Sequence, residues 1–170
     1  MKYLANYIEH TYNENVIIAL LNFYATLTKH MQFARFVSRP FIDKLMELWK
    51  NDLFKVDCVI CFGHLVYVND VDFTESLLTP NFLLCLQNLL KSHSFNMNNN
   101  FLEEVTWLCY NIADGGQRNN EKLFNTEIPS FLLDASRWYN KSKFYNELAL
   151  FLENVLSNSS DEIKLRLFSD

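Results

Sequence analysis

Glycine and proline are nearly absent from this sequence of 170 residues, which contains three of each. Both residues interrupt helices and mark turns, so their scarcity indicates long helical segments. Turn signals of the Asn-Gly or Asp-Gly kind are also few, which disfavours a β-sandwich or β-barrel. The sequence therefore predicts an all-α protein.

Clusters of lysine and arginine are missing as well. The basic residues are scattered singly and the net charge is −5, so the chain lacks the basic patch that nucleic-acid binding usually requires. Hydrophobic residues make up 49% of the chain, which excludes intrinsic disorder. No apolar run reaches the roughly 18 residues of a membrane span, and the N-terminus has no apolar signal-peptide core. We expect neither a nucleic-acid nor a membrane partner.

Cysteine is scarce, but two of the four cysteines form a C-x-x-C motif, Cys58 and Cys61. This spacing occurs in redox motifs and in half of a zinc site. Here it lies within the apolar run 56–68, and no second C-x-x-C follows. We interpret the pair as buried structural thiols and expect no metal or cofactor. Cysteines without a disulfide framework fit a reducing compartment, the cytoplasm or nucleus.

The three prolines open segments of the same kind. Pro40, Pro80 and Pro129 each precede an apolar helical pattern, at intervals of 40 and 49 residues. Proline suits the first turn of a helix, where its missing N–H has no partner to lose. The recurrence indicates a repeat. The tryptophans of two of these segments, Trp49 and Trp138, are predicted to pack in the core.

A second segment recurs four times, at intervals of 42, 47 and 43 residues. Its copies begin at Asn15, Asp57, Glu104 and Glu147, where the acidic residues are expected to stabilise helix N-termini. Seven residues after each start stand Asn22, His64, Asn111 and Asn154. The two markers divide the chain into repeats of about 1–38, 39–78, 79–127 and 128–170. The first repeat is incomplete, reduced to helices over 3–10 and 15–29. A period near 42 fits HEAT or armadillo architecture.

The sequence E-V-T-W-L-C-Y-N-I-A-D-G-G at 104–116 resembles the third helix of armadillo repeats in the importin-alpha family, and Glu127-Ile128-Pro129 resembles the opening of the next repeat. The resemblance is close over 101–135. It implies a right-handed α-solenoid of about four armadillo-like three-helix repeats. It also implies a concave groove for an extended, basic peptide. The peptide-binding residues implied are Asn22, His64, Glu104, Trp107, Asn111 and Asn154.

The spacing of Trp107 and Asn111 makes physical sense without the family. Residues four apart project from one face of a helix. A tryptophan there offers a flat apolar wall, and an asparagine offers a donor and an acceptor to a peptide backbone. The other repeats carry Ile18, Ile60 and Leu150 in place of the tryptophan, so an ordinary import receptor is not expected.

Two functions remain open. The first is a non-enzymatic scaffold that binds an extended segment of another protein in the groove. The second is a structural subunit of a larger assembly, held by exposed aromatic surfaces and repeat ends. An enzyme is disfavoured because the sequence contains no constellation of nucleophile, base or metal ligands.

Overall fold

The computed structural model describes residues 11, 13–28, 39–68, 71–92 and 100–168. Every regular element within these ranges is a helix, so the all-α prediction is confirmed. The chain forms two compact units, residues 1–69 and 70–170. The expected helix over 3–10 lies outside the described residues. The division into four repeats stays a prediction.

The first unit contains α2 (Glu14–Thr28), α4 (Arg39–Leu48) and α5 (Lys55–Val68). Helix α5 packs against both α2 and α4. The ring centroids of Tyr24 and Phe41 lie 4.2 Å apart, and those of Trp49 and Phe62 lie 5.0 Å apart. Trp49 is fully buried, as its predicted role in packing requires.

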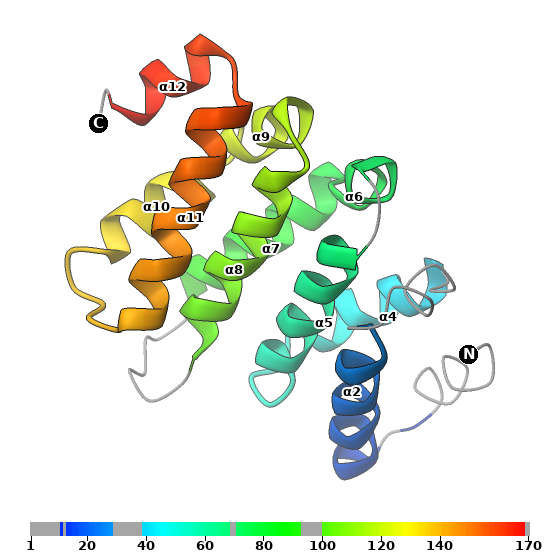
Figure 1. The fold of residues 1–170 in the computed structure, drawn as a ribbon. Helices are drawn as coiled ribbons and strands as arrows, with labels where there is room; N and C mark the ends of the chain where they lie inside the picture. The colour runs from blue at the N-terminus through cyan, green and yellow to red at the C-terminus, as the bar shows by residue number, and fades with distance from the viewer. Residues whose placement is uncertain (1–10, 12, 29–38, 69–70, 93–99, 169–170) are drawn as a thin grey trace. The chain divides into compact units, whose positions relative to one another are not determined.

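In the second unit, short helices pack on short helices and long helices pack on long helices (Figure 1). Its helices are α6 (Val71–Leu77), α7 (Pro80–Ser92), α8 (Phe101–Asp114), α9 (Gln117–Phe124), α10 (Ile128–Ala135), α11 (Ser142–Asn158) and α12 (Asp161–Leu167). The short helices α6, α9 and α12 pack in series, α7 packs on α10, and α8 packs on α11 most extensively. A layer of three helices therefore recurs, and each layer buries the apolar face of the one before it.

In two successive layers, a basic side chain at the same position of the short helix donates a hydrogen bond to a backbone carbonyl of the preceding short helix. Lys122, the sixth residue of α9, donates to the carbonyl of Glu75 in α6 at 2.8 Å. Arg166, the sixth residue of α12, donates to the carbonyl of Phe124 in α9 at 2.7 Å. Carbonyls in the last turn of a helix have no partner within that helix. The next layer satisfies one of them in each case.

The three prolines begin helices, as the sequence predicts. Pro40 and Pro129 are the second residues of α4 and α10, and Pro80 is the first of α7, all within the first turn. The hydroxyl of Thr79 caps α7 by accepting the N–H of Phe82 at 3.2 Å.

Two expectations from the sequence are wrong. Trp138 is 42% exposed, because it follows the end of α10 rather than lying on that helix's buried face. Glu147 is not in a first turn, because α11 begins five residues earlier, at Ser142. Asp57 and Glu104 do lie in the first turns of α5 and α8.

Candidate functional site

Four of the six predicted peptide-binding residues lie on one pair of helices. Glu104, Trp107 and Asn111 belong to α8, and Asn154 belongs to α11. The two helices run side by side (Figure 1). Side chains of α11 bond to α8 near both its ends, as described below, so the pair is parallel. The structure therefore brings these four residues together on one pair of helices.

The exposed part of α8 is a narrow strip. Trp107 and Tyr110 are partly exposed and Asp114 is exposed. Asn111, one turn after Trp107, is only 6% exposed. The aromatic rings and the Asp114 carboxylate are therefore more accessible than the amide of Asn111.

Asn154 connects the two helices. Its side-chain nitrogen lies 3.5 Å from the Tyr110 carbonyl oxygen and 3.5 Å from the Asp114 carboxylate. Both distances are at the long end of hydrogen bonding. The contact fixes the C-terminal part of α11 on α8. Asn154 therefore holds α11 against α8 and also forms part of the surface that the two helices share.

Glu104 is largely enclosed at the N-terminal end of the strip. It is 7% exposed, and its carboxylate accepts from the Asn100 amide at 3.1 Å and pairs with the Lys143 ammonium. The pKa of the nearby Glu147 is raised, chiefly by burial and further by the charge of Glu104, while Lys143 opposes the shift. Lys143 therefore offsets part of the negative charge that these glutamates bring to the surface.

The neighbouring Glu103 forms a second buried carboxylate site that the sequence reasoning missed. Its side chain is 3% exposed and accepts the Tyr139 hydroxyl, with the Lys141 ammonium 4.0 Å away. Burial, this hydrogen bond and the Glu103 charge all raise the pKa of Tyr139. Consecutive glutamates before Trp107 are visible in the sequence, but their partners lie 36 to 39 residues further along the chain.

The remaining two predicted residues lie in the first unit. Asn22 is exposed on α2 and His64 is partly exposed on α5. These two helices pack together, and the Cys61 thiol lies 3.6 Å from the Leu21 carbonyl oxygen between them. The structure thus groups Asn22 with His64, as it groups the other four on α8 and α11. Peptide binding by any of the six stays a prediction.

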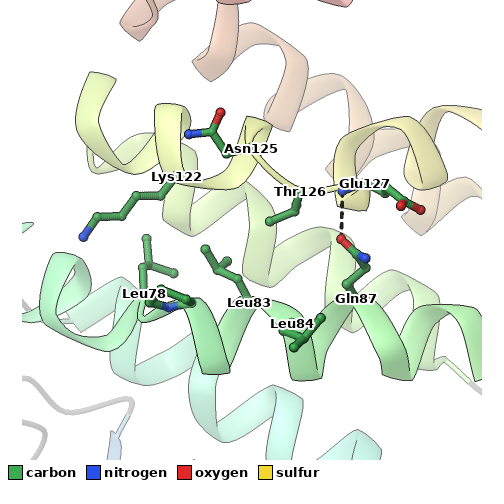
Figure 2. Close-up of a pocket in the computed structure, with 9 residues that line it drawn as sticks. Leu78, Leu83, Leu84, Gln87, Lys122, Asn125, Thr126 and Glu127 are labelled. Atoms are coloured by element: carbon green, nitrogen blue, oxygen red, sulfur yellow. Dashed lines mark hydrogen bonds between the residues drawn. The ribbon is translucent and has the colours of Figure 1, made fainter.

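A separate cavity of about 600 Å³ opens beside α7. Figure 2 shows Leu83 and Leu84 of α7 facing the connection between α9 and α10. The Glu127 N–H donates to the Gln87 side-chain oxygen at 2.9 Å across this cavity. Sequence reasoning missed the cavity because its walls come from segments about forty residues apart, and no motif marks them.

The C-x-x-C cysteines are buried, as predicted. Cys58, Cys61 and Cys109 are inaccessible free thiols, and burial raises the pKa of each. A raised pKa keeps a thiol protonated and unreactive. Over the described ranges, no three histidine, cysteine or acidic residues are placed to hold a metal ion. The helices of the described segments also include none with the length and apolarity to cross a membrane.

No protein-family model matches the sequence, and no curated protein matches it. Solved structures do match. A designed armadillo repeat protein in complex with the peptide (KR)4 superposes with a TM-score of 0.82 at 15% identity, covering 97% of this chain and 67% of the other. An engineered protein gives 0.82 at 16% identity, covering 96% and 66%. A second designed armadillo repeat protein gives 0.79 at 15% identity, covering 96% and 67%.

Proposed function

Because the chain has an armadillo-type repeat fold, we propose that it is a non-enzymatic scaffold that binds an extended segment of another protein along the face formed by α8 and α11. This face comprises Trp107, Tyr110 and Asp114 of α8 with Leu150, Glu153 and Asn154 of α11. The observation that carries the proposal is the pairing of an accessible aromatic strip with amide and carboxylate groups on adjacent parallel helices.

The charges on this face favour a basic segment. Asp114 and Glu153 are exposed carboxylates near the C-terminal ends of α8 and α11, whereas Lys143, the basic residue of α11, pairs with Glu104 near the N-terminal ends of the two helices. Lysine and arginine side chains could lie against Trp107, and such cation–π contacts are worth about 0.5–2 kcal/mol each. One designed armadillo neighbour binds the peptide (KR)4, which supports this choice of ligand class.

The test is fluorescence anisotropy of a labelled peptide of alternating lysine and arginine, titrated with the full chain. An acidic peptide of the same length is the control. We expect saturable binding of the basic peptide that weakens as salt is raised, because the exposed carboxylates are screened. Trp107→Ala should weaken binding by roughly 2- to 30-fold, the equivalent of one cation–π contact.

A matched pair of variants separates the face from general charge attraction. Asp114→Asn with Glu153→Gln removes two exposed carboxylates from the face, and Asp161→Asn with Glu162→Gln removes two exposed carboxylates from α12. The first pair should weaken binding and the second should not. Equal effects of the two pairs, or binding that is unchanged by Trp107→Ala, would contradict the proposal.

A second candidate function is a structural subunit of a larger assembly. It is favoured by large exposed apolar side chains, among them Leu156 of α11 at 40%, Leu165 of α12 at 72% and Phe168, which follows α12, at 75%. A cytoplasmic or nuclear location is proposed with either function, since all four cysteines are free thiols.

A further inference from the structure

Lys143 stands at a position where the repeat pattern does not require a cation. It precedes Glu147, the start of the fourth recurring segment, by four residues. The equivalent positions before the other three segments hold Thr11, Leu53 and Asn100. Their side chains end in a hydroxyl, an apolar group and an amide. The repeated helix therefore forms without a lysine at this place.

The helix that carries Lys143 also disfavours a lysine there. Lys143 is the second residue of α11, and the first turn of that helix contains no acidic residue. A positive charge in a first turn is opposed by the helix dipole. The favourable partner of this ammonium comes from another helix, because Lys143 pairs with Glu104 of α8.

The two sides of this ion pair differ in accessibility. The Lys143 side chain is 51% exposed, whereas the Glu104 side chain is 9% exposed. The Glu104 oxygen that accepts from Lys143, Oε1, also accepts from the Asn100 amide at 3.1 Å. Glu104 lies one helical turn before Trp107, on the same side of α8. The ammonium is therefore the accessible half of a pair that adjoins the aromatic strip.

Glu147 belongs to the same group of charges. Burial raises the pKa of its carboxyl group, Lys143 lowers it, and the charge of Glu104 raises it further. One ammonium therefore acts on two carboxylates at this end of the face. At the other end, neither Asp114 nor Glu153 forms an ion pair with a basic residue that the structure describes. The negative charge of the face is thus compensated at one end and uncompensated at the other.

We propose that Lys143 is a specificity-determining residue that competes with the ligand, because its ammonium occupies the Glu104 carboxylate that a basic side chain of the bound segment would otherwise approach. This inference rests on the function proposed above. A lysine or arginine of the ligand has to displace Lys143 before it pairs with Glu104, whereas Asp114 and Glu153 receive one directly. The competition weakens binding at one end of the face and favours basic side chains at the other.

The test measures the affinity of the full chain for the labelled peptide of alternating lysine and arginine by fluorescence anisotropy. Lys143→Met removes the charge and keeps an apolar side chain of similar length. A largely buried carboxylate without a cation is costly, and a cation from the ligand restores the pair. We expect Lys143→Met to lower Kd by roughly 2- to 5-fold, the contribution of one solvent-screened ion pair.

Lys164→Met is the matched control. It changes the net charge equally, but Lys164 pairs with the exposed Asp161 on α12 and not with the face, so it should lower Kd less. Equal changes for the two variants, or wild-type binding with no gain from Lys143→Met, would overturn this inference alone. Absence of saturable binding to both the wild type and Lys143→Met would overturn the proposed function, and the inference with it.

A second experiment separates competition from simple charge repulsion. Glu104→Gln removes the carboxylate that Lys143 occupies and keeps the shape of the side chain. In this background the gain from Lys143→Met should shrink to that from Lys164→Met. An undiminished gain would mean that Lys143 acts by repulsion of the peptide, and would overturn the competition. Circular dichroism spectra that match the wild type confirm that each variant is folded.

Discussion

The hydrogen bond from Tyr139 to Glu103 should be among the most valuable polar contacts of the second unit. Tyr139 follows α10 and Glu103 lies in the first turn of α8, so the bond joins two successive layers. Both side chains are almost completely buried, at 2% and 3% exposure. Tyr139→Phe removes one oxygen and keeps the ring packed on Phe144, whose centroid lies 5.3 Å away.

The expected cost follows from the charge and burial of Glu103. A hydrogen bond to a charged group contributes about 1.5–3 kcal/mol, and a buried acceptor left without its donor keeps its desolvation penalty. The Lys141 ammonium lies 4.0 Å from the Glu103 carboxylate, and the Lys141 side chain is 37% exposed. Solvent therefore screens its attraction to Glu103, and Lys141 only partly replaces the lost hydrogen bond. We expect Tyr139→Phe to lower the free energy of unfolding by about 1.5–3 kcal/mol.

Urea unfolding followed by far-ultraviolet circular dichroism measures this loss as a lower midpoint at constant slope. Tyr145→Phe is the matched control, because its hydroxyl donates to a neutral carbonyl at an exposed site and should be worth about 0.5–1.5 kcal/mol. In a Glu103→Gln background the effect of Tyr139→Phe should shrink, since the acceptor is then neutral. A loss for Tyr139→Phe no larger than that for Tyr145→Phe would refute the reasoning.

The same contact predicts a pH dependence. Burial and Glu103 raise the pKa of Tyr139 above its ordinary value, so folding favours the protonated phenol. Its contribution is complete below the unfolded pKa, about 10, and is lost as the pH rises above that value. Wild-type stability should fall faster with pH above this point than that of Tyr139→Phe. Parallel curves for the two proteins would contradict the prediction.

Three further predictions concern other parts of the chain. A thiol reagent should modify the partly exposed Cys85 first and the buried Cys58, Cys61 and Cys109 only after unfolding. Burial raises the pKa values of these three thiols, that of Cys109 to about 12. Rapid labelling of more than one thiol in the folded chain would contradict this prediction. Gly116→Ala should cost about 1–3 kcal/mol of stability in urea unfolding, because Gly116 has φ 94° and ψ −169°, a region that essentially only glycine adopts; an unchanged midpoint would count against it. Lys122→Met and Arg166→Met should each lower the melting temperature through the loss of a bond worth about 0.5–1.5 kcal/mol, whereas Arg118→Met, at an exposed surface pair, should change it little.

The repeat pattern was legible in the sequence because each layer uses the same local signals. Prolines set the starts of α4, α7 and α10, and the recurring Asn or His marks the long helices. Boundaries without such a signal were misread. The repeat alignment places Glu147 in a first turn, whereas α11 begins five residues earlier, at Ser142. Helix α8 ends at Asp114, and Gly116, with its positive φ, follows in an extended conformation.

By itself, the sequence determined the helix type, the period and the chemical character of the α8 surface, because these depend on local spacing along one helix. Only the tertiary structure decided which of those side chains are available. It buried Asn111 and enclosed Glu104 with Lys143, and it turned Asn154 toward α8. It also left Tyr145 and Leu156 of α11 exposed while it buried Leu102 and Ala113, their equivalents on α8. The physical reason is that burial and pairing depend on the neighbouring layer, about forty residues away, and local spacing does not record which neighbour a face receives.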